Sequence, residues 1–455
     1  MAERRVVVGG TIAALVAADA LGAAGTPTRL LAPANGLGRG FTSIPDGERR
    51  LSLGVRLLEL SYEDDPAPPP LSAYAPGLDG HRPYARTIRR WTEQLLGEHL
   101  REIAPPRVVV DGRLVDDYLF TVDLLPLATA AAPAERERIA AEAEAATARG
   151  GSAGVLSTEL GETTLATASL ANHGQTFHDR FIEPLARKFV ARGSSSILAA
   201  WRRKAWLPLF WPETVAEAFS TGSVRFRPRR TFHEVAPGGV GGFVDALVAR
   251  VRSHASVEFV QVGKLTAIES RPRAVTLRFD DGHAERAARP AVGVPPAELY
   301  AAAAVPFELA RMRTVLAWIE GDRETLAPGV DLAHVLDPGN PVVRFSGGST
   351  TPAPGRRIVC VELRHDLPQQ DAAAAAIAGL REAGVLTGEA EAVRASAAQM
   401  LPVPDGATRA QMTAAAVAFA ARGHDLRLLG AAVAPGADSL NEQIVQGLQA
   451  AEELR

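Results

Sequence analysis

The chain has 455 residues, of which 47% are hydrophobic and 22% charged, and its formal net charge is -3. A chain of this length can bury a large core, and we expect it to divide into roughly two domains. The near-neutral charge provides neither the basic field that attracts nucleic acid nor a polybasic face for a membrane, so a small molecule or a protein is the expected partner. The single cysteine, Cys360, excludes an internal disulfide, and its apolar, strand-like surroundings favour a core residue over a nucleophile.

The first predicted element is a strand, a tight turn and a helix over residues 6–25, with the sequence VVVGGTIAALVAADALGAAG. A basic start before an apolar run also resembles a secretory signal peptide, but Gly9 and Gly10 interrupt that run and Asp19 falls inside it. No other stretch approaches the ~18–20 uninterrupted apolar residues of a membrane span. We therefore expect a cytoplasmic protein without a membrane span.

Helices and strands follow one another in an interrupted order. A second strand at 28–33 leads into a glycine-rich loop, and a helix is expected from Thr87 to Glu102. Next come two strands about an Asp-Gly turn in 107–115, a helix over 134–149 and a helical, aromatic section from Thr176 to Trp211. A helix at 237–251 precedes strands over 257–285, with a hairpin at Asp281-Gly282. Strands are expected again over 330–365, and a strand, a loop and a helix over 426–454. The fold class is therefore α/β, or α+β overall.

Several separate segments carry a likeness to a known group of proteins. They are the strand-turn-helix at 6–25, GLGRGF at 36–41, the glycine turn, helix and strand from Pro237 to Glu269, VPPAEL at 294–299, and SLNEQIVQGLQAAEEL at 439–454. In this order they resemble the flavoproteins of the amine oxidase, protoporphyrinogen oxidase and UDP-galactopyranose mutase group. WTEQLLGEHL, DGRLVDDYLF and FIEPLARKF are most similar in arrangement to the mutase-like branch.

The resemblance implies a discontinuous, Rossmann-like FAD/NAD(P)-binding domain and a second domain that holds the substrate. We expect the first to comprise residues 1–60, 225–300 and 405–455. The remaining segments, 61–224 and 301–404, would then form a mixed-sheet and helical substrate or cap domain.

The resemblance also implies which residues would surround FAD. The pyrophosphate would lie at the start of the first helix, and a ribose acceptor is expected at the end of the second strand. The implied positions are Gly9, Gly10, Thr11 and Ala14 in the first turn, Ala32 at the ribose position, Gly38, Arg39 and Gly40 in the following loop, Gly430 and Ala431 in the terminal motif, and Ser439, Leu440 and Asn441 at the start of the last helix.

Three of these positions depart from the family pattern. Thr11 replaces the second glycine of the Gly-x-Gly-x-x-Gly/Ala fingerprint, so a branched side chain crowds the pyrophosphate, although its hydroxyl is an alternative phosphate donor. Neither Ala32 nor Ala431 has the carboxylate that the family places there. Because a charge-assisted hydrogen bond contributes about 1.5–3 kcal/mol, three such losses would weaken binding by roughly three decades or more. FAD is therefore expected either to bind weakly or to be absent.

Candidate ligand-binding residues outside the cofactor motifs are aromatic and cationic. Trp201 and Trp206 flank a basic run, RFRPRR follows at 225–230, and Arg344 lies in a predicted strand. In the mutase-like branch an arginine at a position similar to Arg344 touches substrate phosphate. These residues suit a phosphorylated or aromatic ligand, but core tryptophans beside a solvated basic face and a surface ion pair explain them equally.

Other kinds of site have little support in the sequence. His173 and His178 are the closest histidine pair, and their spacing does not place both on one helical face, so no metal site is expected. No Gly-x-Ser-x-Gly elbow or phosphate loop is present. Catalytic residues cannot be assigned.

Two classes of function remain open. The first is an FAD-dependent oxidoreductase or mutase-like isomerase acting on a sugar nucleotide, an amine or a specialised metabolite. The second is a flavin-free relative, which is either a non-redox catalyst in the old substrate cavity or a non-catalytic partner subunit of an intact flavoprotein.

Overall fold

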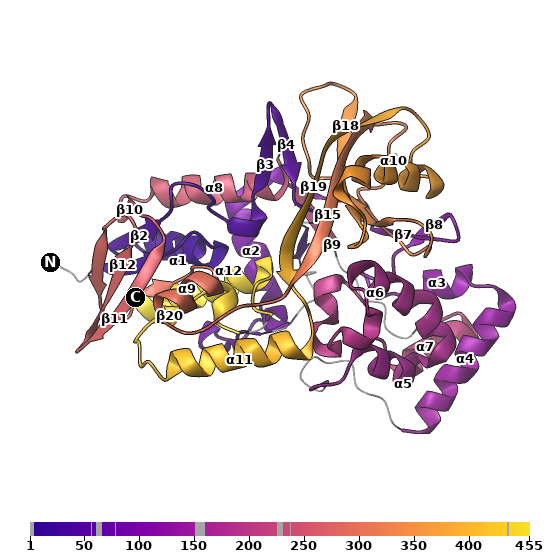
Figure 1. The fold of residues 1–455 in the computed structure, drawn as a ribbon, viewed down its shortest axis with the longest axis horizontal. Helices are drawn as coiled ribbons and strands as arrows, with labels where there is room; N and C mark the ends of the chain where they lie inside the picture. The colour runs from indigo at the N-terminus through magenta and orange to yellow at the C-terminus, as the bar shows by residue number, and fades with distance from the viewer. Residues whose placement is uncertain are drawn as a thin grey trace.

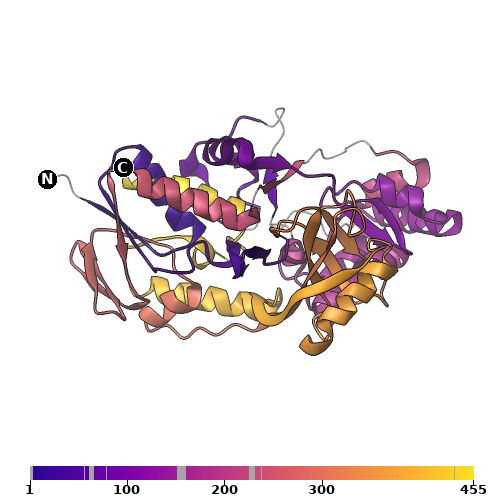
Figure 2. The ribbon, with the colours of Figure 1, turned by 90° about the horizontal axis from the view of Figure 1, so that it is seen from above.

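The computed structural model describes residues 4–55, 57–60, 66–77, 79–150, 160–224, 231–236, 238–434 and 436–455. The arginine-rich stretch 225–230, a candidate ligand-binding segment, lies outside the described residues. The molecule is elongated, with the N- and C-termini near each other at one end and a helical lobe at the other (Figure 1; Figure 2).

A five-stranded parallel sheet forms the centre of the first lobe. Its strand order is β10-β2-β1-β14-β20, with bounds β1 Arg5–Val8, β2 Thr28–Ala32, β10 Val257–Gln261, β14 Ala291–Val292 and β20 Arg427–Leu428. The valines of β1 are buried, as expected for a parallel strand covered on both faces. Helix α1, Ile12–Ala23, follows β1 and confirms the predicted strand-turn-helix.

Helices cover one face of this sheet, and a small antiparallel sheet lies on the other. Helices α2 (Ala85–Leu96), α8 (Gly239–Ser253) and α12 (Leu440–Leu454) share one hydrophobic core with α1. The opposite core contains β11 (Leu265–Arg271), β12 (Ala274–Phe279), β13 (Ala284–Ala287), α9 (Pro296–Ala302) and α11 (Gly406–Ala420). Asp281 and Gly282 lie between β12 and β13, so the predicted hairpin is confirmed.

A seven-stranded sheet extends from the middle of the molecule to the second lobe. Its order is β19-β15-β18-β17-β16-β7-β8, with bounds β7 Arg107–Val110, β8 Arg113–Asp116, β15 Arg311–Asp322, β16 Leu332–Val335, β17 Val342–Ser346, β18 Arg356–Leu363 and β19 Ala390–Pro402. Helix α10, Ala372–Glu382, packs against one face. Cys360 is fully buried in β18, which agrees with its interpretation as a core residue.

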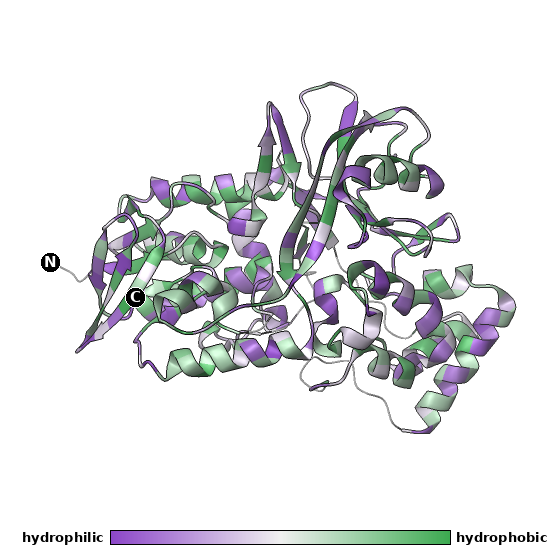
Figure 3. Ribbon diagram, viewed as in Figure 1, coloured by the Kyte–Doolittle hydropathy of each residue, from purple (hydrophilic) through white to green (hydrophobic). Residues whose placement is uncertain are grey.

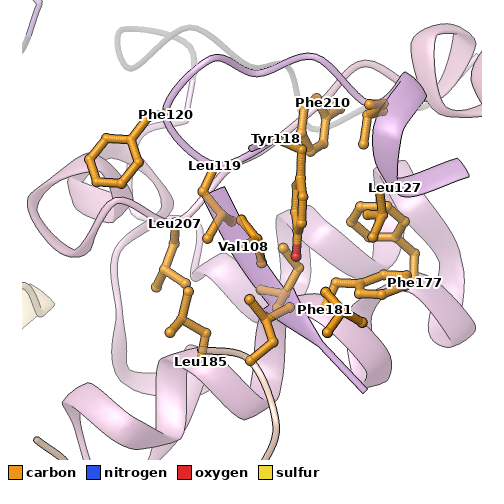
Figure 4. Packing of buried hydrophobic residues seen from close by; sticks show 14 of the residues in the cluster. Val108, Tyr118, Leu119, Phe120, Leu127, Phe177, Phe181, Leu185, Leu207 and Phe210 are labelled. Atoms are coloured by element: carbon orange, nitrogen blue, oxygen red, sulfur yellow. The ribbon is translucent and has the colours of Figure 1, made fainter. Parts of the chain in front are cut away.

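Five helices pack near the other face of this sheet. They are α3 (Leu125–Ala130), α4 (Pro133–Ala148), α5 (Leu165–Phe177), α6 (Glu183–Phe189) and α7 (Pro212–Thr221). Aromatic side chains fill their core, among them Tyr118, Phe177 and Phe181 (Figure 4). Helix α4 buries Ile139, Ala143 and Ala146 and exposes its charged residues, and Figure 3 shows hydrophilic residues along its outer side.

Short strands join the two lobes. The hairpin of β3 (Ser43–Asp46) and β4 (Arg49–Ser52) projects from the first lobe, and β5 (Leu58–Leu60), β9 (Thr231–Val235) and β6 (Leu100–Glu102) form a small antiparallel sheet. Strands of the first sheet come from the three segments predicted for the cofactor-type domain, although α2, outside those segments, shares its core. The domain boundaries themselves stay a prediction.

Two predicted helices differ from the structure. Helix α2 ends at Leu96 rather than at Glu102, because Gly97 adopts a φ of 52° and the chain then forms β6. The section from Thr176 to Trp211 is only partly α-helical, since a π-helical turn spans His178–Ile182 and Trp206 adopts a left-handed φ of 56°. Within the described residues, no helix is long and apolar enough to cross a membrane.

Candidate functional site

The turn after β1 requires glycine at its first position. Gly9 has a φ of +109°, and a Cβ there would clash with the carbonyl oxygen of Gly293 at the end of β14. A Cβ at Gly10 would lie 3.1 Å from Leu37, which sits over the turn. The ends of β1 and β14 therefore meet closely where the resemblance predicts a pyrophosphate.

Thr11 fills the space where the parallel strands end. Its hydroxyl caps α1 by accepting a hydrogen bond from the backbone N–H of Ala14 at 3.3 Å. A Cβ on Gly293 would collide with this hydroxyl, and one on Gly430 would lie 3.5 Å from the Thr11 methyl group. Thr11 thus uses its hydroxyl as an internal cap and occupies the approach to the helix N-terminus.

Two glutamines of α12 pair with backbone donors at the same place. The Gln443 Oε1 accepts from the N–H of Ala13 at 3.4 Å, and the Gln446 Oε1 accepts from the N–H of Gly430 at 2.6 Å. Their amide nitrogens donate to the carbonyl oxygens of Asp438 and Ala437 at 3.1 and 2.8 Å. The sequence interpretation did not identify either residue, although two glutamines at the start of a helix expected to face a cofactor are an unusual polar signal.

The loop after β2 closes over Gly10. The Gly38 N–H donates to the Gly10 carbonyl at 2.7 Å, while the Arg39 guanidinium lies 3.7 Å from the carboxylate of Glu298 and Gly40 is exposed. Ala32, at the implied ribose position, is fully buried, and its carbonyl accepts from Val262. In this arrangement, protein atoms cover the implied ribose position.

The remaining predicted cofactor residues lie at the end of β20 and the start of α12. Ala431 belongs to a single 3-10 turn over Gly430–Ala432, and Ser439 caps α12 by accepting from the N–H of Glu442 at 3.2 Å. Leu440 is buried, and the Asn441 amide donates to the Glu59 carbonyl at 2.9 Å. The structure therefore brings the predicted positions together around the N-termini of α1 and α12.

A buried carboxylate lies in the first turn of α12. Glu442 is 1% exposed and accepts hydrogen bonds from the Tyr74 hydroxyl and from the backbone N–H of His81, the latter at 2.8 Å. Burial and the neighbouring Glu442 raise the pKa of Tyr74. The phenol therefore stays protonated and acts as a hydrogen-bond donor.

The fit of a cofactor depends on backbone N–H groups that already donate hydrogen bonds within the protein. A pyrophosphate would need N–H groups at the start of α1, and the resemblance implies that Gly430 lies beside it. Here Gln443 and Gln446 already use the N–H groups of Ala13 and Gly430, and Thr11 uses that of Ala14. In this arrangement the residues present do not fit a pyrophosphate.

A second feature is a small cavity of about 30 Å³ between the seven-stranded sheet and α6. Its walls carry basic side chains, a histidine and one carboxylate, namely Lys188, Lys204, Arg313, Arg344, His365 and Glu362. This volume has room for about two water-sized groups, so it suits the terminal group of a ligand.

Arg344 is the buried cation of this cavity. It is 6% exposed and donates from Nη2 to the Glu362 Oε2 at 2.8 Å, while its guanidinium lies 5.5 Å from the ring centre of Phe189. Among the described residues, no hydrogen-bond partner reaches its Nε or Nη1. Arg344 does form an ion pair, with Glu362, but both groups are buried. The alternative of a surface ion pair is therefore wrong in its position.

Lys188 and His334 shape the electrostatics beside Arg344. The Lys188 ammonium donates to the carbonyls of Val335 and Val342 at 2.6 and 2.7 Å, and burial lowers its pKa to about 7. Burial, with Arg344 nearby, lowers the pKa of the fully buried His334 well below its usual range. His334 is therefore neutral, Arg344 supplies the permanent positive charge, and Lys188 adds a second charge only below about pH 7. Lys188 was not identified from the sequence, where it looks like an ordinary residue of a short helix.

The predicted tryptophans do not line this cavity. Trp201 is buried in a small core with Leu198 and Leu209, and the Trp206 ring packs against Phe120 in a tilted arrangement with ring centres 4.1 Å apart. Phe120 also contacts His334, the β-sheet partner of Arg344. Trp206 thus approaches Arg344 through two intervening side chains, whereas Trp201 is placed elsewhere.

The two closely spaced histidines form hydrogen bonds within the protein. His173 accepts from the backbone N–H of Phe210 at 2.8 Å, and burial lowers its pKa to about 3. His178 lies 3.9 Å from the carboxylate of Glu183. The described part of the chain contains no group of three or more His, Cys, Asp or Glu residues that could hold a metal ion.

Comparison with known proteins identifies the fold. The chain matches no protein-family model, and no curated protein sequence matches it. A structure of reduced UDP-galactopyranose mutase matches with a TM-score of 0.72 at 16% identity, covering 99% of this chain and 95% of that one. A putative protoporphyrinogen oxidase from Exiguobacterium sp. 255-15 gives 0.64 at 14% identity, covering 100% and 98% of the two chains. A putrescine oxidase variant redesigned in cofactor binding gives 0.55 at 13% identity, covering 99% and 98%.

These likenesses extend over the whole length of the chain. They show that it shares the fold of these UDP-galactopyranose mutase, protoporphyrinogen oxidase and putrescine oxidase structures, which confirms the resemblance at the level of the fold. At 16% identity or less, substrate and chemistry do not follow from the fold.

Proposed function

We propose that this chain is a flavoprotein-fold protein that binds an anionic small molecule at the Arg344 cavity and holds FAD weakly or not at all. The observation that carries the proposal is the buried Arg344 guanidinium, whose Nε and Nη1 have no partner among the described residues. A buried cation with unused donors is costly, and an anionic ligand group relieves that cost.

The neighbours of Arg344 favour an oxyanion. Arginine presents several donors in a planar fork that matches a phosphate or carboxylate. In its protonated form Lys188 uses two of its three ammonium donors on backbone carbonyls, and an anionic ligand that accepts from the third would favour this form. Glu362, the one carboxylate of the cavity wall, already accepts from Arg344 and from the N–H of Val55 at 3.0 Å.

The proposed class of ligand rests on the structural neighbours and on the positive charge of the Arg344 cavity. UDP-galactopyranose mutase is named for a sugar nucleotide, and a phosphorylated metabolite of that kind suits the cationic cavity best. A specialised metabolite with a carboxylate is the wider class, whereas a simple amine, which is cationic, does not suit this cavity. Under this proposal, a reaction at the cavity would be non-redox. The second candidate function is a partner subunit of an intact flavoprotein, which the paired donors at α1 favour.

A binding experiment on two arginine variants tests this proposal. UDP, UDP-galactose and inorganic pyrophosphate are titrated into the full chain by isothermal calorimetry. Arg344→Ala is expected to weaken binding at least tenfold, the effect of about 1.4 kcal/mol, because a charge-assisted hydrogen bond contributes about 1.5–3 kcal/mol.

The matched control is Arg278→Ala, which removes an exposed guanidinium that pairs with Glu269 on the small antiparallel sheet, outside the cavity wall. It should leave the affinity within about twofold, because surface ion pairs contribute little. Equal affinities for the wild type and Arg344→Ala would remove Arg344 from the ligand site.

A further inference from the structure

The last helix buries an unusual number of polar side chains. Five of them, Asn441, Glu442, Gln443, Gln446 and Gln449, are each no more than 8% exposed. Each forms a hydrogen bond with another part of the chain. Polar side chains are rarely buried at this density unless they satisfy groups that would otherwise lack partners.

Two of these side chains meet the donors that a dinucleotide would use. Gln443 accepts from Ala13 at the N-terminus of α1, and Gln446 accepts from Gly430 at the end of β20. We propose that Gln443 and Gln446 are an internal replacement for the cofactor pyrophosphate, which closes this site in the folded chain. The inference rests on the weak-FAD part of the proposed function and adds the residues responsible.

The replacement is held rigidly in place. Each amide oxygen accepts from a backbone donor, and each amide nitrogen donates to the segment that precedes α12, at Asp438 or Ala437. Both ends of each side chain are therefore satisfied. A phosphate entering from solution would have to break these four hydrogen bonds and rotate both side chains away.

The packing around the two glutamines leaves little room for adjustment. Gly447, one residue beyond Gln446, brings α12 so close to α1 that a Cβ there would lie 2.6 Å from the Ala13 carbonyl. Gln443 and Gln446 are 6% and 1% exposed. The helix pair α1 and α12 thus docks through direct protein contacts, including the hydrogen bond from the Ala13 N–H to Gln443.

A gain-of-binding experiment tests the inference. Inorganic pyrophosphate and ADP are titrated into the full chain and into the double variant Gln443→Ala, Gln446→Ala, and binding is followed by calorimetry. Removal of both amides frees the N–H groups of Ala13 and Gly430, so the double variant should bind at least tenfold more tightly than the wild type. Each single variant should show part of this gain.

The matched control is Gln449→Ala on the same helix. Gln449 donates to the carbonyls of Leu71 and Tyr74 and accepts from the Arg427 side chain, so its partners differ from those of Gln443 and Gln446. Its loss should bring no gain in pyrophosphate affinity. Arg344→Ala in the background of the double variant separates this site from the cavity, because it should leave the new affinity unchanged.

The outcomes distinguish the two proposals. Equal affinities of the wild type and of folded double and single variants would overturn the internal replacement, even if the wild type holds no FAD. If the double variant fails to fold, the wild type provides the test. A rise in the wild-type melting temperature with millimolar pyrophosphate, seen also in Arg344→Ala, would overturn the closed site. Isolation of the wild type with one FAD per chain would instead overturn the proposed weak FAD binding.

Discussion

The ammonium group of Lys188 lies in the protein core, 4% exposed, with its pKa lowered to about 7 by burial. In the unfolded chain the same group has an ordinary pKa of 10.5. Between these two values the unfolded state binds more protons than the folded state, so the unfolding free energy rises with pH across this window.

We expect Lys188→Met to flatten that rise. The contribution of Lys188 approaches about 1.4 kcal/mol per pH unit in the middle of the window, and methionine does not titrate. Urea unfolding at several pH values from about 7 to 10 measures the slope. The exposed Lys264→Met is the control and should keep the wild-type slope. An unchanged slope in Lys188→Met would show that the buried ammonium does not release its proton in this range.

Single residues also show what the sequence could predict about the site. Thr11 was identified because it breaks a glycine fingerprint within a few positions of β1, and its cap on α1 is a local contact. Gln443 was missed because its partner, Ala13, is 430 positions away in the sequence. The side chain's role depends on the packing of α12 on α1, which no local pattern contains.

The close contact between α1 and α12 depends on one glycine. A Cβ at Gly447 would lie 2.6 Å from both the Ala13 carbonyl oxygen and the Val16 Cβ. Alanine at this position gains up to about 1 kcal/mol of helix propensity, whereas overpacking costs about 1–3 kcal/mol. Gly447→Ala should therefore lower the melting temperature.

Gly406→Ala is the matched comparison for this element. Gly406 begins α11, and a Cβ there would meet only one atom, a Glu162 carboxylate oxygen at 3.9 Å. This variant should melt at or above the wild-type temperature, because the propensity gain meets no clash. The melting temperatures are measured by circular dichroism. An unchanged melting temperature for Gly447→Ala would mean that α1 and α12 can move apart without loss of stability.

Elements with a strong local signal were predicted well. The strand-turn-helix at 6–25, helix α4 and the β12–β13 hairpin were all confirmed, since apolar periodicity and Gly-containing turns define them. The section from Thr176 to Trp211 was not, because its breaks coincide with tertiary packing: Trp206 adopts a left-handed conformation and its ring contacts Phe120.

At the scale of the whole molecule, the order of segments predicted more than any one motif. Five parallel strands from separated parts of the chain form one sheet, as the resemblance implied, and the likeness to UDP-galactopyranose mutase covers 99% of the chain. The register of the seven-stranded sheet, such as β7 beside β16, comes from pairing across more than two hundred residues. Local periodicity carries no information about such pairing.

The whole chain provides the last test, in a melting experiment with FAD. A ligand at about 100 times its Kd stabilises the folded state by about 2.7 kcal/mol, so a binder with a Kd near 1 µM would melt higher in about 100 µM FAD. We expect no such rise, and a colourless protein as isolated, because Thr11, Gln443 and Gln446 use the donors that the phosphates need. Riboflavin, which lacks the pyrophosphate, is the control for binding of the ring alone. A yellow protein with one FAD per chain, or a clear rise with FAD but not with riboflavin, would show that the glutamines yield to the cofactor.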